Sequence, residues 1–407
     1  MRRVLTSRLG GLTALSSAAY YVSAKKSIAA VNGEAFEDAL STPSRCYTTR
    51  IYTFIRPLLF RIFDPEVAHG LTIKLFSILG RLPISGSQLP PELEQSLFGL
   101  TFTSPLGISA GFDKNGDALS FTTSGVLQVG HVEIGSVSAQ PWAGNSKPRV
   151  FRLERQEALL NRMGLNNNGA EAVSEKIREI SSSVPFGINL VKTPDPSILE
   201  EAAISDFGQS FRLLAPLTSW VTLNVSCPNT AEGKTFESPE AISQLIGMVN
   251  AAREEMNLKI PIFIKLSPLP ENPDEFYFEN LKSILNELIT LKVDAVIIAN
   301  TAADRGADLE ISSDLGKGGI SGKPLFNRTR KLVSFVNEGT AGQIPIIASG
   351  GVSTAEEAFD LMTRGAKLVQ LYTAMVYHGP GVFYDLNRGL RRILILKGKE
   401  NISNLAN

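Results

Sequence analysis

The sequence has few of the residues that mark several common classes of protein. Its 407 residues include only two cysteines, Cys46 and Cys227, and three histidines, His69, His131 and His378. Two distant cysteines cannot form a disulfide framework, and the histidines lack zinc- or iron-site spacing, so no metal is expected. The formal net charge is zero, which argues against a nucleic-acid partner because such proteins need a basic face.

Acidic residues are absent from the first 33 positions, where five basic residues occur among many serines and threonines. This composition is typical of a mitochondrial transit peptide. The uncharged stretch from Leu9 to Ala24 is shorter than the roughly 20 apolar residues that span a bilayer. A disordered leader and a short membrane anchor are therefore alternative interpretations of residues 1–45, which also include a linker.

Two segments between residues 46 and 90 carry apolar residues at helical spacing, one from Ile51 to Phe63 and one from Leu71 to Leu82. The sequence Asp64-Pro65-Glu66 separates them, and proline is favoured in the first turn of a helix. Basic residues accompany both wide apolar faces. This pattern predicts an amphipathic helical hairpin that binds the surface of a membrane; a hairpin that only packs on the rest of the protein is the alternative.

Strand-like and helical patterns alternate through the rest of the chain. This alternation predicts parallel strands joined by right-handed crossovers, and eight strands favour a closed barrel. The predicted fold class is therefore α/β, with a (β/α)8 TIM barrel over residues 91–407 and an N-terminal amphipathic helical hairpin. The expected strands are Leu106–Ala110, part of Val126–Val137, Phe186–Val191, Val221–Ser226, Ile262–Ser267, Ala295–Asn300, Ile344–Ser349 and Leu368–Thr373.

Polar side chains stand at the ends of most expected strands, the side of such a barrel where active sites lie. They include Asn189, Asn224, Asn300, Lys114 and Lys265. A buried amide without a partner costs about 1–3 kcal/mol, so several converging amides require one. A planar heterocycle with N–H and C=O groups would satisfy them, and we therefore expect a ligand site at this end of the barrel.

Glycine-rich runs near two neighbouring strand ends indicate a phosphate site. Gly318-Gly319-Ile320-Ser321-Gly322 precedes a helical pattern, Ser349-Gly350-Gly351 ends the seventh strand, and Tyr372-Thr373 ends the eighth. Glycine lets backbone N–H groups approach an anion, and barrels often bind phosphate in these loops. Each run alone is equally explained as a tight turn.

Several motifs, in order along residues 46–395, resemble the dihydroorotate dehydrogenase family. The hairpin, with Asp64-Pro65-Glu66-Val67-Ala68-His69, is similar to that of the membrane-associated, quinone-reducing class, which is class 2. The barrel motifs that carry the resemblance are Ser109-Ala110-Gly111-Phe112-Asp113-Lys114, Glu133-Ile134-Gly135-Ser136, Asn161-Arg162-Met163-Gly164-Leu165-Asn166, Asn224-Val225-Ser226-Cys227-Pro228-Asn229-Thr230, Ile320-Ser321-Gly322-Lys323-Pro324-Leu325 and Ser349-Gly350-Gly351-Val352.

The resemblance implies an FMN-dependent oxidation of dihydroorotate to orotate in pyrimidine (UMP) biosynthesis, with ubiquinone as the final electron acceptor. It also implies a place at the mitochondrial inner membrane, peripheral or single-pass anchored, with the hairpin on the membrane surface. No obligate protein partner is inferred.

The resemblance implies three sets of binding residues. FMN would be held by Ala110, Gly111, Ser136, Asn189, Asn224 and Lys265, with its phosphate at Ser321, Gly322, Gly350, Gly351, Tyr372 and Thr373. The substrate would be held by Lys114, Asn161, Asn224, Asn229, Asn300 and Thr301. The quinone would meet His69, Arg152 and Tyr372 in a tunnel between hairpin and barrel, although His69 alone could simply pair within the hairpin.

Cys227 and Lys114 are the catalytic candidates. By resemblance, the base that deprotonates the substrate follows the fourth strand, where the quinone-reducing class usually has serine and the soluble fumarate-using class has cysteine. A thiol titrates near pH 8.5, so it is a better base near neutrality than an alcohol. An inert buried thiol is the alternative. Leu165 and Ala299 also depart from the family pattern, but neither removes a charged group.

Other functions are consistent with parts of this pattern. Cys227 raises the alternative that fumarate or NAD is the oxidant, which the hairpin opposes. An FMN barrel that reduces uridine in RNA is a second alternative, which the neutral charge opposes. A barrel that has lost catalysis is a third, which the presence of Lys114, Asn224, Cys227 and Asn229 opposes.

Overall fold

The structure is a computed structural model that describes residues 46–226, 236–304 and 315–405. The predicted leader, residues 1–45, lies outside the described residues, as do Cys227 and Asn229.

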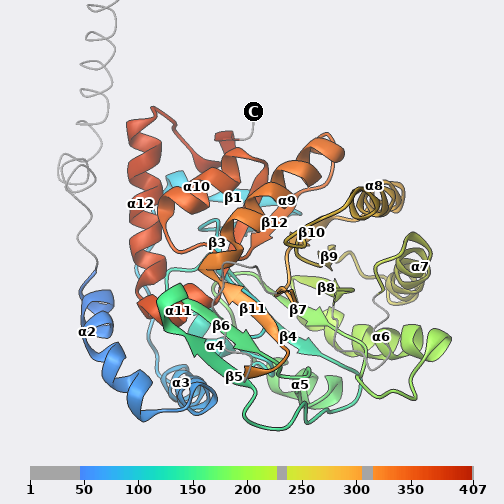
Figure 1. The fold of residues 1–407 in the computed structure, drawn as a ribbon, viewed down its shortest axis with the longest axis horizontal. Coiled ribbons are helices and arrows are strands. Elements are labelled where there is room, and N and C mark those ends of the chain that lie inside the picture. Colours follow the sequence, from blue (N-terminus) through green and yellow to red (C-terminus); the bar gives the residue numbers. More distant parts are fainter. Residues whose placement is uncertain (1–45, 227–235, 305–314, 406–407) are drawn as a thin grey trace, which may run out of the picture. The chain divides into compact units, whose positions relative to one another are not determined.

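Eight parallel strands form a closed barrel, which confirms the predicted fold (Figure 1). The barrel strands pair with one another in the order in which they occur in the chain, and the last strand, β13, returns to pair with the first, β3. The second barrel strand starts at His131, later than the apolar run, because Gln128 has a φ of 55° that extended chain does not adopt. The barrel strands are β3 (Leu106–Ile108), β4 (His131–Val137), β7 (Phe186–Leu190), β8 (Trp220–Asn224), β9 (Ile262–Leu266), β10 (Ala295–Ile298), β12 (Ile346–Ser349) and β13 (Ala366–Leu371).

Helices surround the barrel and bury their apolar faces against the strands. Their starts follow from local sequence: Ser238 and Asp274 accept backbone hydrogen bonds at two N-termini, and Thr354 with Glu357 forms a capping box at a third. The helices are α4 (Leu119–Thr122), α5 (Ala170–Ile177), α6 (Glu200–Leu214), α7 (Pro239–Glu255), α8 (Glu275–Thr290), α9 (Phe326–Gly339), α10 (Ala355–Thr363), α11 (Thr373–His378) and α12 (Val382–Leu396).

A short pair of antiparallel strands closes the end of the barrel where the barrel strands begin. It consists of β1 (Gln95–Leu97) and β2 (Leu100–Phe102). Phe102 of β2 packs with Trp220 and Phe263 in a buried cluster, and Leu97, Phe98 and Leu100 pack against that cluster. In the part of the chain that the structure describes, side chains fill this end, which leaves the carboxyl ends of the strands for a ligand.

A three-stranded antiparallel sheet, not expected from the sequence, lies at the other end. It consists of β5 (Val150–Leu153), β6 (Ala158–Asn161) and β11 (Gly319–Gly322), with β6 in the centre. The glycine-rich run expected to bind phosphate is therefore partly a strand. Glycine is required there by close approach, since a Cβ on Gly319 would lie 2.2 Å from Thr301 Oγ1. This sheet carries Asn161 to the mouth of the barrel.

Two helices form where the N-terminal hairpin was predicted, α2 (Tyr47–Ile62) and α3 (Pro65–Leu79). Asp64 caps α3 by accepting from the N–H groups of Glu66 and Val67. The hairpin lies beside α11 and β5 (Figure 1), and the Tyr52 hydroxyl donates to the Val376 carbonyl at 2.7 Å. None of the described helices is long and apolar enough to span a bilayer.

The outer side of this hairpin is apolar. Phe54 on α2 is 86% exposed, and both helices carry further exposed leucine, isoleucine or valine side chains. A soluble monomer rarely exposes so many large apolar side chains together. The exposed side chains are Tyr47, Ile51, Phe54, Ile55, Leu58 and Ile62 from α2, with Val67, Leu71, Leu75 and Ile78 from α3.

Candidate active site

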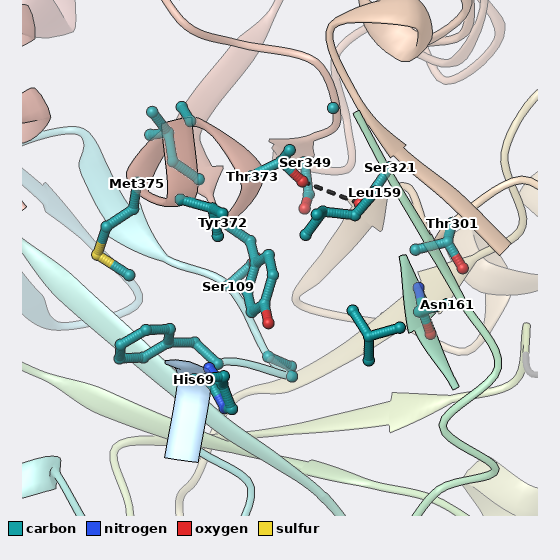
Figure 2. A pocket seen from close by; sticks show the side chains of 18 of the residues that line it. His69, Ser109, Leu159, Asn161, Thr301, Ser321, Ser349, Tyr372, Thr373 and Met375 are labelled. Carbon is teal, nitrogen blue, oxygen red and sulfur yellow. Dashed lines mark hydrogen bonds between the residues drawn. The ribbon is translucent and has the colours of Figure 1, made fainter. Parts of the chain in front are cut away.

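A cavity of about 320 Å³ lies at the carboxyl ends of the barrel strands. Its wall combines three parts of the fold: the strand ends, the β5–β6–β11 sheet and the N-terminal hairpin. Figure 2 shows His69 from the hairpin, Asn161 from β6 and Tyr372 from the end of β13 around one space.

Most of the residues predicted for the site line this one cavity. Asn189 is the exception among the described residues: it is fully buried behind Ser136 and Asn224, to which it is hydrogen-bonded. Cys227 and Asn229 lie outside the described residues. The lining includes His69, Ala110, Gly111, Lys114, Ser136, Arg152, Asn161, Asn224, Lys265, Asn300, Thr301, Ser321, Gly322, Gly350, Gly351, Tyr372 and Thr373.

The asparagines from neighbouring strands form one hydrogen-bond network. Asn224 Nδ2 lies 3.2 Å from Ser136 Oγ and 3.3 Å from Asn189 Oδ1. On its other side, Ser226 Oγ donates to Asn224 Oδ1 at 2.9 Å and accepts from Asn300 Nδ2 at 3.0 Å. The barrel thus brings the amides of Asn224 and Asn300 to one wall of the cavity, with Asn189 behind them.

The loop after β3 is fixed by a carboxylate that holds the backbone next to Lys114. Asp113 is buried and accepts from the N–H groups of Asn115, Asp117 and Ala118. Lys114 Nζ donates to the Gly111 carbonyl at 3.3 Å. Burial, and secondly the nearby charge of Arg149, lower the pKa of Lys114 to about 8. At neutral pH most molecules therefore have a charged ammonium group in the cavity, and an anionic ligand would stabilise this charge.

Another part of the cavity wall is suited to binding an anion, because it combines three glycines with two hydroxyl groups. Gly322, Gly350 and Gly351 have φ values of 99°, 144° and 81°, which side chains disfavour. Ser321 Oγ and Thr373 Oγ1 lie 2.9 Å apart, the pair joined by the dashed line in Figure 2. Two hydroxyls beside three glycines can together surround phosphate oxygens.

Known proteins resemble this chain over most of its length. The family model for dihydroorotate dehydrogenase matches residues 92–394. A relative from Rhizobium etli, named dihydroorotate dehydrogenase (quinone), is 35% identical over 82% of this chain and 90% of its own length. One of the same name from Roseiflexus is 36% identical over 85% of this chain and 95% of its own.

The chain belongs to the dihydroorotate dehydrogenase family. A crystal structure of DHODH from Eimeria tenella in complex with ferulenol has a TM-score of 0.77 and 29% sequence identity to it. The similarity covers 87% of this chain and 97% of that one.

The hairpin side of the cavity in this chain includes a cluster of aromatic rings. The His69 ring packs on Phe112 with centroids 5.5 Å apart and on Tyr372 at 6.4 Å. Burial, and then the charge of Lys114, lower the pKa of His69 to about 4, while burial raises the pKa of Tyr372 to about 12. Both rings are neutral near pH 7, which suits an uncharged ligand.

Arg152, expected to contact the quinone, also connects the barrel to the hairpin. Its Nη1 donates to the carbonyl of Phe63 at 2.8 Å and of Phe60 at 3.3 Å, and its guanidinium lies 4.2 Å from the Phe60 ring centroid. Arg152 therefore caps the C-terminal end of α2, in addition to lining the cavity.

Two ionic groups at the site were not predicted from the sequence. Glu66 on α3 receives both Nε and Nη2 of Arg149, with the closest contact at 2.8 Å, and so joins the hairpin to the barrel. Glu133 on β4 is fully buried and accepts from Asn189 and Gln370. A charged residue on an otherwise apolar buried strand was the available signal for Glu133.

Proposed function

We propose that the chain oxidises dihydroorotate to orotate, using bound FMN and passing the electrons to a membrane quinone. One observation carries the proposal: a single cavity is lined both by an ammonium group with several amides and by the neutral rings of His69 and Tyr372. The names of its relatives, dihydroorotate dehydrogenase (quinone), support the same reaction.

The cavity residues fit FMN. The hydroxyls of Ser321 and Thr373, with the backbone of Gly322, Gly350 and Gly351, would hold its phosphate. Bound FMN supplies the acceptor for a hydride from the substrate. Ala110, Gly111, Ser136, Asn224 and Lys265 would hold its ring and ribityl parts, together with Tyr372 beside the phosphate and Asn189, which acts through Ser136 and Asn224. A Cβ on Gly111 would meet no atom within 4 Å, so its backbone faces open space.

The substrate would bind through its carboxylate and its pyrimidine edge. The ammonium of Lys114 would pair with the carboxylate, a charge-assisted contact that is stronger than a neutral hydrogen bond. The pyrimidine is a planar ring with N–H and C=O groups, which amides on a rigid wall can orient. These amides are those of Asn161, Asn224 and Asn300, with Thr301 beside them and Asn229 as a further candidate.

Cys227 would act as the base. Its predecessor Ser226 is buried and hydrogen-bonded to Asn224 and Asn300, two of the proposed substrate amides. The thiolate would take the proton from C5 of dihydroorotate while the hydride leaves C6, which gives the double bond of orotate. Lys114 holds the carboxylate in place throughout this step.

The hairpin would admit the quinone from the membrane. Tyr52, Phe60 and His69 line the cavity from the hairpin, and Arg152 and Tyr372 face them. The exposed apolar side of α2 and α3 fits the interface of a lipid bilayer. With the basic, acid-free leader, this supports a location at the mitochondrial inner membrane.

The oxidant is tested by comparing turnover of dihydroorotate with a short-chain ubiquinone, fumarate and NAD. The proposal expects rapid orotate formation only with the quinone. Faster turnover with fumarate would instead support the soluble type of reaction that a cysteine at position 227 suggests.

A further inference from the structure

A buried carboxylate lies beneath the proposed active site without belonging to its wall. Glu133 on β4 is fully buried, and the cavity lining does not include it. Its Oε1 accepts from Asn189 Nδ2 at 2.8 Å and its Oε2 from Gln370 Nε2 at 2.9 Å. A charge inside a barrel is costly unless its partners compensate, so its place calls for an explanation.

The hydrogen bonds between this carboxylate and the cavity all run in one direction. Asn189 donates to Glu133 and accepts from Ser136 and Asn224. Beyond Asn224, the donors continue in the same sense: Ser226 donates to Asn224, Asn300 to Ser226, and the Thr301 N–H to Asn300. Each donor in this series of hydrogen bonds therefore points toward Glu133.

The groups at the two ends of this series of hydrogen bonds cannot exchange the roles of donor and acceptor. A backbone N–H such as that of Thr301 can only donate, whereas an ionised carboxylate can only accept. An asparagine between them can rotate by half a turn and exchange its donor and acceptor. With both ends fixed, only one orientation of Asn189 and Asn224 satisfies every hydrogen bond.

We propose that Glu133 is a positioning residue for dihydroorotate oxidation. By accepting from Asn189, it fixes which atoms Asn224 and Asn300 present to the pyrimidine ring. This inference rests on the proposed function, since it needs a ligand that distinguishes amide oxygen from amide nitrogen. Glu133 itself touches neither ligand.

Gln370 decides how the inference can be tested. Among the described residues, Gln370 Oε1 has no hydrogen-bond partner. In the variant Glu133→Gln, Gln370 could therefore turn around and accept from the new amide, which would preserve the original direction. The test must prevent this rearrangement, so Glu133→Gln is examined in a protein that also carries Gln370→Met, whose side chain is only a weak hydrogen-bond acceptor.

Three variants separate the effect of hydrogen-bond direction from the effect of side-chain packing around position 133. Gln370→Met keeps the carboxylate, Glu133→Gln with Gln370→Met removes it at constant volume, and Glu133→Gln with Gln370→Glu moves it from β4 to β13. In the last variant the new carboxylate at position 370 must accept from the amide at 133, whose oxygen then still faces Asn189. The direction of the hydrogen bonds from the cavity to position 133 is thereby restored.

The measurement is the dissociation constant of orotate for each FMN-loaded variant, from the change in the flavin absorbance spectrum. Losing one well-placed hydrogen bond to the pyrimidine should weaken binding about tenfold in E133Q/Q370M relative to Q370M. E133Q/Q370E should regain most of that affinity. The melting temperature and the retained FMN, measured on the same samples, report whether packing has changed.

The outcomes are distinct. Equal orotate affinity in Q370M and E133Q/Q370M would overturn the inference, as would E133Q/Q370E binding no better than E133Q/Q370M. A lower melting temperature with unchanged affinity would assign Glu133 a purely structural role and overturn it too. If E133Q/Q370M does not fold, the comparison of E133Q/Q370E with wild type decides. A wild-type protein that binds FMN but not orotate would refute the proposed function first, and the inference with it.

Discussion

Binding of orotate should weaken as the pH rises from 7 to 9, because Lys114 loses its charge. Burial and the charge of Arg149 place its pKa at about 8 in the unliganded protein. Lysine is charged below its pKa, so about nine-tenths of the molecules carry the ammonium at pH 7 and about one-tenth at pH 9. If the charged form binds the carboxylate, the apparent affinity should fall about tenfold over this range.

The assay is titration of the FMN-loaded protein with orotate at several pH values, which avoids the proton transfer of turnover. Lys114→Arg provides the control, since arginine stays charged at pH 9, and its orotate affinity should change little with pH. A wild-type affinity that is constant between pH 7 and pH 9 would refute the role of Lys114. So would an arginine variant with the same pH dependence as wild type.

Three further predictions concern other parts of the chain. Cys227→Ala should retain FMN but lose rapid flavin reduction by dihydroorotate in stopped-flow absorbance; an unchanged rate would exclude Cys227 as the base. Glu66→Gln should lower the free energy of unfolding by about 2 kcal/mol, since it breaks a charged contact with buried Arg149, whereas Glu255→Gln in an exposed pair should cost under about 1 kcal/mol; equal losses in urea denaturation would contradict this. Phe54→Glu on the hairpin should reduce co-sedimentation with lipid vesicles, whereas Phe276→Glu, which alters an exposed phenylalanine on α8, should not; equal effects would argue against the hairpin as the membrane contact.

The barrel and the hairpin helices could be predicted because their signals are local. Each buried strand is a short apolar run, and each helix repeats its apolar residues every three to four positions. The β5–β6–β11 sheet could not be predicted, because its strands are four residues long and Asn161 bonds to a carbonyl 158 positions away. Short glycine-containing strands show no alternation to recognise.

The site was predictable where a polar residue ends a strand and not where the partner is distant. Lys114, Asn224 and Asn300 were found from strand ends. Glu133 was missed because its role depends on Gln370, which is 237 positions later. Asn189 was expected to contact the cofactor, yet it lies behind the wall, since sequence cannot distinguish a lining residue from one that supports it.

The most direct test of the account is anaerobic mixing of the purified, FMN-loaded protein with dihydroorotate, followed by addition of a short-chain ubiquinone. The account predicts loss of the absorbance of oxidised flavin together with an equimolar amount of orotate, and full recovery of that absorbance when the quinone is added. A flavin that stays oxidised in the presence of dihydroorotate would contradict the account.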